Sequence, residues 1–322
     1  KNPLAVLNEH NDVANSREFI GSADIDYKVH GFEDLRLHAT LGADVAKGKQ
    51  VTVNSPAYPD NTYNYYGYHG SESILKRNLS LSAYAQYYHD FNDKAKNHFD
   101  IMGGYEYQHF WKGTDNNYRG YYPGTNNDES LRGKAYNETY KWYRTENYLV
   151  SFFGRANWSL MDRYYVTATV RDDGSSRFKD HWAVFPSFAF MWKVNEENNL
   201  KDIKWLSDLK LRLGWGQTGQ QDVNNDYAWI PTYTKNSDKN TLYPASDDGT
   251  LYRPDNYTPK LKWETTTTYN IGVDWGVLDQ RLTGSVDWYY RKTENLLNYA
   301  PTKALSAFRN QAWQNIGSLR NM

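Results

Sequence analysis

The sequence predicts an all-β protein, an antiparallel up-and-down β-barrel that crosses a membrane with its strands. Three observations support this: side chains alternate between apolar and polar, connections alternate between short and long, and aromatics abound, with 29 Tyr, 12 Trp and 12 Phe among 322 residues. The mean hydropathy is only -0.88, and the longest mostly apolar stretch, Ala183–Trp192, has about ten residues where a membrane helix needs about 20. A membrane strand needs only about 9–11 residues, half of which face inward.

The alternation is the signature of strands with two different faces. In Leu35–Val45 every odd position is Leu, Ala or Val, and every even position is Arg, His, Thr, Gly or Asp. Leu149 and Phe153 depart from the pattern on a nominally polar face, and the only helical candidate, Glu196–Leu206, is short. We expect strands over Leu209–Trp215, Tyr269–Trp275, Leu282–Tyr290, Arg17–Val29, Ile74–His89, His98–Trp111, Asn147–Trp158, Tyr164–Arg171 and Trp182–Val194, and a last one from near Trp313.

The connections favour a barrel over a sandwich with one wet face. The expected short connections are His30–Asp34, Asn92–Asn97, Leu160–Arg163 and Leu278–Gln280, with a moderately longer one at Asn195–Ser207. The long ones are Ala46–Ser73, Lys112–Glu146, Gln217–Leu261 and Lys292–Ala312, with a shorter one at Asp172–His181. Bacterial outer-membrane barrels have short turns at one end and long loops at the other, whereas a Greek-key sandwich has no reason to follow this order.

A sheet survives in hydrocarbon only when it closes on itself, because every backbone donor and acceptor must be paired there. About ten or eleven strands are visible, and the pattern stops inside a strand at Asn315–Ser318. We therefore expect residues 1–322 to be a partial transmembrane barrel domain that the missing parts of a larger barrel complete. Lys1 is not a natural start and no signal peptide is visible, so we expect that upstream sequence has been removed.

Several classes of site are not expected. The absence of Cys excludes disulfides and thiolate metal sites, and a formal charge of -1 gives no reason to expect nucleic acid. The eight scattered His predict no zinc. Asp222, Asn224 and Asp226 begin a calcium-loop spacing, but the Gly and the closing Glu are missing, so we expect a solvated loop and no cofactor. No nucleophile has a base and an orienting partner, so an enzyme is not expected.

Several local strings carry a family resemblance. The longest is Leu261–Leu297, with Lys262-Trp263-Glu264-Thr265-Thr266, Arg281-Leu282-Thr283-Gly284-Ser285-Val286-Asp287 and Arg291-Lys292-Thr293. The others are Arg171-Asp172-Asp173-Gly174-Ser175-Ser176-Arg177-Phe178, Gly214-Trp215-Gly216-Gln217-Thr218-Gly219 and Asn2-Pro3-Leu4-Ala5. In order and spacing these strings resemble the SusC/RagA type of TonB-dependent transporter, over essentially the whole chain.

The resemblance implies a barrel of about 22 strands filled by a plug, in the bacterial outer membrane. It implies active import of a large nutrient, with a glycan or oligosaccharide favoured over a peptide. It also implies energy from the TonB complex, reached through segments that this chain lacks, and a SusD-like surface lipoprotein that closes the outer face. The plug, the TonB-contacting segment and the terminal strands are absent from the sequence, so transport belongs to the parent protein.

Aromatic residues in the long connections are the candidate substrate-binding residues, because a flat ring can stack on a sugar ring. They are Tyr118, Tyr121, Tyr122, Trp229 and Tyr233. Loop packing and contact with the lid protein are the alternative roles. The outward-facing aromatics, which we expect to contact lipid, are Trp158, Tyr164, Trp275 and Trp288.

The remaining motifs have structural interpretations. Asp173-Gly174-Ser175-Ser176 predicts a turn at a strand end, and the glycines of Gly214–Gly216 and Gly272–Gly276 predict relief of crowding. Asp274 and Asp287 are expected to share one face of adjacent strands in the lining of the lumen.

Two other functions stay open at this point. A passive porin would conduct ions without TonB, which a channel recording tests. A secreted carbohydrate-binding β-sandwich, or a secreted enzyme, would be soluble without detergent.

Overall fold

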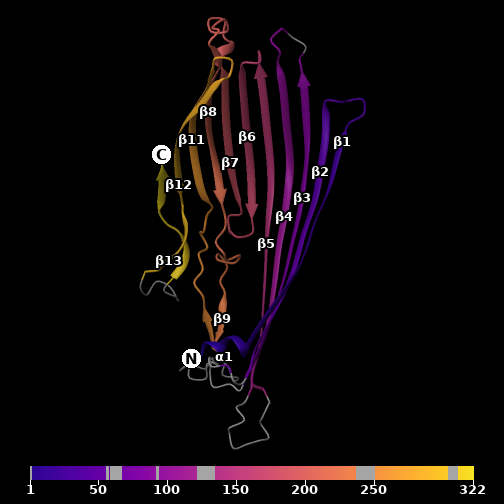
Figure 1. The fold of residues 1–322 in the computed structure, drawn as a ribbon, viewed down its shortest axis with the longest axis vertical. Helices are drawn as coiled ribbons and strands as arrows, with labels where there is room; N and C mark the ends of the chain where they lie inside the picture. The colour runs from indigo at the N-terminus through magenta and orange to yellow at the C-terminus, as the bar shows by residue number, and fades with distance from the viewer. Residues whose placement is uncertain are drawn as a thin grey trace, which may run out of the picture. The chain divides into compact units, whose positions relative to one another are not determined.

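The computed structural model describes residues 2–55, 58, 67–91, 94–121, 135–236, 251–303 and 311–322. The strands of its main sheet are β1 (His10–Lys28), β2 (Leu35–Asn54), β3 (Tyr68–Asp90), β4 (His98–Tyr121), β5 (Ala135–Leu160), β6 (Tyr164–Ser175), β7 (Trp182–Lys193), β8 (Leu206–Gln220), β11 (Glu264–Val277), β12 (Leu282–Glu294) and β15 (Ser318–Asn321). Hydrogen-bonded neighbours follow this same order (Figure 1). The predicted all-β, up-and-down arrangement is confirmed.

Little else is regular in the described residues. Two ribbons pair β9 (Tyr233–Asn236) with β10 (Leu251–Pro254), and β13 (Leu297–Pro301) with β14 (Gln311–Asn315). The helix α1 (Pro3–Asn8) has six residues and is capped by Asn2, whose side chain accepts a hydrogen bond from the Leu4 amide at 3.0 Å. A 3₁₀ turn, η3 (Val194–Glu196), replaces the short helix expected there. No helix in the described ranges is long and apolar enough to cross a membrane.

The chain divides into two compact units. The first comprises Lys1–Ala23, Thr40–Leu81 and Gln108–Asn147, and the second comprises Asp24–Ala39, Ser82–Tyr107 and Tyr148–Met322. In the first unit, the Arg77 guanidinium lies 4.1 Å from the ring centre of Trp111, and Arg144 binds both carboxylate oxygens of Asp115 at 2.8 and 3.0 Å. The second unit contains β6, β7, β8, β11 and β12 complete, and these strands lie side by side (Figure 1).

The strand register gives the second unit one apolar face and one polar face. One row of directly paired positions consists of Trp158, Val166, Phe190, Leu213, Ile271 and Trp288. The neighbouring row consists of Asn157, Thr167, Ala189, Gly214, Asn270 and Tyr289. We call the face of the first row the outer face and that of the second row the inner face.

Large apolar side chains of the outer face are exposed, with Val286 67% and Trp288 52% accessible. An extended apolar surface of this kind marks a face that contacts another protein or the interior of a membrane. Register also places Tyr164 and Trp275 on this face, so the outward direction predicted for these aromatics is confirmed.

Several strands extend beyond the predicted limits. Residues 46–54 and 112–121 were expected in loops, but they continue β2 and β4 as far as Asn54 and Tyr121. Ladder hydrogen bonds join backbone groups whatever the side chains are, so pairing continues where the apolar alternation has stopped. Trp313 lies in the β13–β14 ribbon, and the eleventh strand of the sheet is β15.

Three of the four expected short connections are confirmed as tight turns: His30–Asp34, Leu160–Arg163 and Leu278–Gln280. Asn92 and Asp93 of the fourth lie outside the described residues. Met161 and Asp162 have φ of 57° and 53°, and Leu278, Asp279 and Gln280 all have positive φ between 54° and 63°. The turn predicted at Asp173–Ser176 was wrong in its position, because β6 continues to Ser175. Gly174 is not among the described residues with positive φ. Its role is to leave room for the Trp182 ring, which a Cβ would meet at 2.9 Å.

Candidate functional site

The inner face of the second unit carries arginines that each bind two carboxylates, and Arg171 on β6 is the first. Its Nη2 donates to Glu106 at 2.5 Å, and its Nε donates to Asp173 at 2.7 Å. A third bond, 2.9 Å long, goes to the hydroxyl of Ser151, which is 1% exposed. Phe153 lies beneath the guanidinium, 5.9 Å from ring centre to Cζ. A cation favours this position over a ring, which explains why an aromatic residue interrupts the polar face.

Arg212 on β8 is the second such arginine. It binds Asp274 through two hydrogen bonds of 2.8 Å and approaches Asp287 at 3.0 Å. This is the bidentate geometry in which arginine binds carboxylates most strongly. Gly272 lies opposite both Arg212 and Asp287 in the register, and a Cβ there would meet Asp287 Oδ1 at 2.5 Å. The prediction that Asp274 and Asp287 share one face is confirmed, and Gly272 makes room for their shared arginine.

The long connections of the second unit meet in an apolar core, which we call the loop cluster. It comprises Phe178, Phe185, Val223, Ala228, Leu261 and Trp263, and each of them is less than 9% exposed. Phe178 follows β6, Val223 follows β8 and Leu261 precedes β11. Leu149 packs against the same core, which accounts for its departure from the strand alternation.

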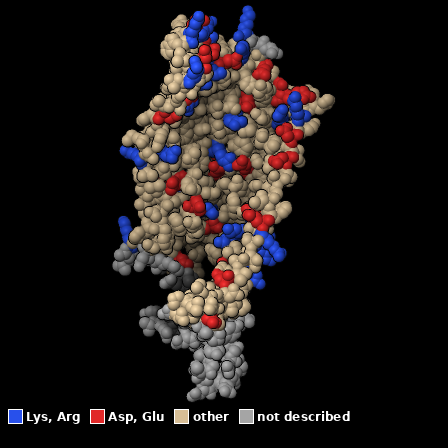
Figure 2. Space-filling view, viewed as in Figure 1, with Lys and Arg blue, Asp and Glu red and all other residues tan. Residues whose placement is uncertain are grey.

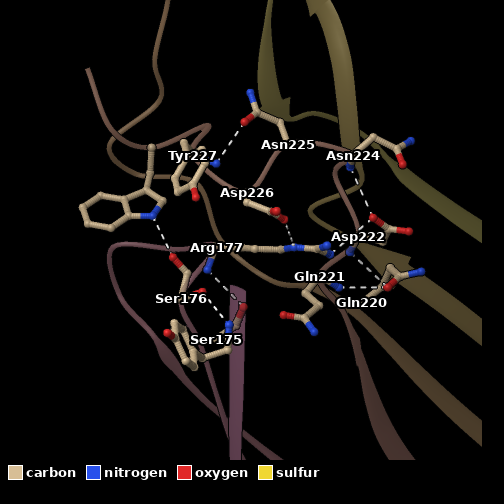
Figure 3. Close-up of polar contacts among 12 residues, drawn as sticks. Ser175, Ser176, Arg177, Gln220, Gln221, Asp222, Asn224, Asn225, Asp226 and Tyr227 are labelled. Carbon is tan, nitrogen blue, oxygen red and sulfur yellow. Dashed lines mark hydrogen bonds and ion pairs between the residues drawn. The ribbon is translucent and has the colours of Figure 1, made fainter. Parts of the chain in front are cut away.

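Arg177 precedes Phe178 of the loop cluster in the chain, and it makes the polar contacts that Figure 3 shows. It donates to Asp226 at 2.9 Å and to Asp222 at 3.3 Å, and the Arg177 and Asp226 side chains are only 17% and 10% exposed. The Asp222 carboxylate also accepts the amide of Asn224 at 3.2 Å. Two of the three residues with partial calcium-loop spacing, Asp222 and Asp226, therefore bind an arginine of this chain. The solvated loop expected there was wrong for Asp226, which is largely buried.

The five aromatic candidates have different environments. Trp229 donates its indole N–H to the Ser176 carbonyl at 3.0 Å and is partly buried. Tyr233 opens β9 and is 66% exposed. Tyr118 stacks on Tyr68 in the first unit, with ring centres 6.2 Å apart. Tyr121 ends β4, but its side chain, like the whole of Tyr122, lies outside the described residues.

The arginine–carboxylate clusters are the part of the site that sequence reasoning missed. Arg171 and Arg177 stand in a string that carries the family resemblance, but nothing nearby in the sequence indicates their distant partners. Arg171 binds Glu106, 65 positions away, and Arg177 binds Asp226, 49 positions away. The available signal was a charged residue at an inward position of each strand, as at Arg212 and Asp274. Figure 2 shows Lys and Arg interspersed with Asp and Glu over the face in view.

The short-turn end has its own polar cluster around Glu197, between β7 and β8. Its carboxylate accepts the Tyr164 hydroxyl at 2.5 Å and the Trp192 indole N–H at 3.1 Å. The Tyr164 bond, aided by that of Trp192, holds the pKa of Glu197 below its ordinary value. In the neighbouring turns, the 2.6 Å bond between Lys96 and Asp162 raises the pKa of Lys96 and lowers that of Asp162.

Solved structures share this fold. The RagAB peptide transporter superposes with a TM-score of 0.82 over 98% of this chain and 34% of its own, at 22% identity. Its open-open state gives a TM-score of 0.81 over 98% of this chain and 33% of its own, at 22% identity. An up-and-down sheet with an apolar outer face and a polar inner face defines the class as a β-barrel protein of the bacterial outer membrane.

The family follows from sequence. The model described as TonB dependent receptor-like, beta-barrel, matches residues 3–322, and the chain belongs to this family. TonB-dependent receptor SusC of Bacteroides thetaiotaomicron is 47% identical over all of this chain and 31% of its own length. TonB-dependent receptor P26 of Formosa agariphila is 28% identical over 99% of this chain and 32% of its own. The chain thus spans about a third of these curated relatives, and the SusC/RagA-type resemblance is confirmed.

Proposed function

We propose that the parent protein imports a large nutrient actively across the outer membrane, and that this chain forms part of the barrel wall. The observation that carries the proposal is the inner face, where Arg171 and Arg212 are each bound by two carboxylates. Such a wall offers hydrogen-bond donors and acceptors together, and a solute rich in hydroxyl groups uses both. Membership of a TonB-dependent family supports energised import over a passive pore.

We propose a glycan or oligosaccharide as the cargo in preference to a peptide. The SusC-like sequence favours this choice, while the likeness to a peptide transporter at 22% identity supports the fold alone. Among the five aromatic candidates, Tyr233 has the ring most available for stacking, since it is 66% exposed. Trp229 is hydrogen-bonded to the Ser176 carbonyl, so its first role is to stabilise the connections around the loop cluster. Tyr118, Tyr121 and Tyr122 complete the proposed set.

The proposal includes components beyond residues 1–322. A plug, a TonB-contacting segment and the remaining strands belong to other parts of the parent protein. The related SusC is about three times as long as this chain. A SusD-like surface lipoprotein is the proposed lid. In this arrangement the lid captures cargo, TonB-linked energy displaces part of the plug, and the wall supplies binding groups rather than chemistry.

Two experiments test the proposal. The parent protein, purified from membranes in detergent, should carry a bound lipoprotein and a glycan that mass spectrometry detects. Uptake of that glycan by cells should stop when a protonophore removes the energy source of TonB. Uptake that continues without energy would indicate a porin instead, and a protein that needs no detergent and comes alone would contradict the proposal altogether.

A further inference from the structure

A row of small polar residues crosses the inner face of the second unit. The strand register aligns Arg155, Thr169, Ser187, Gly216, Thr268 and Arg291 on six neighbouring strands, β5 to β8, β11 and β12. We call this the hydroxyl row. Neighbouring strands are about 4.8 Å apart, so the two terminal arginines stand about 24 Å apart along the wall.

The side chains in the middle of the hydroxyl row are small, so they rise little above the sheet. The row's four central residues are no larger than Thr, and a Cβ added to Gly216 would meet the Ser187 Cβ at 3.0 Å. A ligand can therefore lie close to the sheet there. The hydroxyls of Thr169, Ser187 and Thr268 have no hydrogen-bond partner among the described residues, and each can both donate and accept a bond.

Arg155 at one end differs from the paired arginines of the second unit. Arg171, Arg177 and Arg212 each bind two carboxylates. Within the described part of the chain, Arg155 has no ion pair, and its Nε is buried without a hydrogen-bond partner. A guanidinium has five donors and no acceptor, and a buried donor left without a partner costs free energy. An acceptor from outside these residues would satisfy it.

We propose that Arg155 binds a carboxylate of the cargo while the hydroxyl row binds the hydroxyl groups beside it. The planar fork of arginine fits a carboxylate with two parallel bonds, and a cation that pairs with no acid of the described residues favours an anionic ligand. The ligand that combines carboxylates with many hydroxyls is an acidic oligosaccharide built from uronate sugars. Arg291 at the far end, exposed and beside the Tyr289 ring at 5.9 Å, meets a second carboxylate. This assignment rests on the proposed import of a glycan and narrows its substrate class.

Calorimetry on the full-length protein in detergent tests the proposal, with trigalacturonate as the acidic probe and maltotriose as the neutral one. The Arg155→Gln variant should bind trigalacturonate about tenfold or more weakly, since it loses a hydrogen bond between two charged groups. Its maltotriose affinity should not change. Arg155→Lys should lose less, because the charge stays while the fork is lost. Arg281→Gln, which removes the same charge beside a short turn, should leave both affinities unchanged.

Further outcomes separate this inference from the proposed function. Thr169→Val removes one hydroxyl of the row beside Arg155, and it should weaken binding of both probes modestly. This milder variant tests the row even where Arg155→Gln does not fold. Equal trigalacturonate affinities in Arg155→Gln and the unsubstituted protein would overturn the inference, as would an unsubstituted protein that does not bind trigalacturonate. Energised uptake of a neutral glycan in that case would leave the import proposal intact.

Discussion

The guanidinium of Arg212 on β8 donates two hydrogen bonds of 2.8 Å to the carboxylate of Asp274 on β11. The two strands pair so that Lys210, not Arg212, lies directly opposite Asp274. The bond is therefore diagonal, and it passes over the missing side chain of Gly272. The position that lacks a Cβ is what lets one arginine reach two strands.

Removing this arginine should destabilise the wall. Arg212→Met leaves the carboxylates of Asp274 and Asp287 without their cation, and we expect a loss of about 1–2 kcal/mol in the free energy of unfolding. The value is below that of a fully buried pair because the Arg212 side chain is 36% exposed. Urea unfolding of the protein in lipid vesicles measures it. Arg281→Met, at an exposed position, should change the free energy little, and an equal loss in both variants would contradict the role of Arg212.

A methyl group at Gly219 should disturb the loop cluster. Its Cβ would lie 2.1 Å from Cζ of Phe185, a ring that is 7% exposed and packs edge-on against Trp263. Overpacking of this kind costs about 1–3 kcal/mol. Gly48→Ala is the matched variant, since nothing lies within 4 Å of its added Cβ, and replacing a strand glycine by alanine should stabilise slightly. Unfolding curves that shift equally for both variants would show that the cluster is not tightly packed.

Glu197 should contribute a pH-dependent part of the stability. Its folded-state pKa is lowered, chiefly by the hydrogen bond from Tyr164, so its contribution is complete above the unfolded pKa of about 4.3. The contribution is lost as the pH falls through the folded value. Glu197→Gln should therefore reduce the drop in unfolding free energy on acidification below pH about 4.3. Glu196→Gln is the control, because it removes the same charge from a residue that does not bind Tyr164. The pH dependence of its unfolding free energy should match that of the unsubstituted protein.

A charge on the outer face should be costly in a bilayer. Val286 lies directly opposite Val273 and is 67% exposed, and an arginine at the centre of a lipid-facing strand costs about 2–4 kcal/mol. Ser285, its neighbour on β12, faces inward with Asp274. Val286→Arg should therefore lower the unfolding free energy in vesicles while Ser285→Arg leaves it almost unchanged. Similar losses for the two variants would contradict the assignment of faces.

The strands were predictable where one face is apolar and the other polar. Tyr269–Trp275 alternates so regularly that its place, direction and outward face follow from the sequence. Beyond Val45 the pattern ends in Lys47, Gly48 and Lys49, where neither face needs apolar residues, yet β2 continues to Asn54. Backbone pairing has no side-chain signature there, so the true length of the strand could not be predicted.

The site was less predictable than the fold. Phe178, Val223 and Leu261 are single apolar residues in polar connections, more than 35 positions apart, and only the folded chain brings them into one core. The same holds for Arg177 and Asp226, which are 49 positions apart. Asp274 and Asp287 were predictable as neighbours, because the turn at Leu278–Gln280 fixes the register of β11 and β12.

The facing of β12 tests the central claim most directly, and the absence of Cys in the chain makes the measurement simple. Single Cys substitutions at residues 284–289 would carry spin labels in lipid vesicles, and collision with oxygen and with a water-soluble nickel complex would be measured at each. We expect oxygen contact to peak at Gly284, Val286 and Trp288, and nickel contact to peak at Ser285, Asp287 and Tyr289. Equal contact with both reagents along the strand, without a period of two, would contradict a wall between lipid and a polar interior.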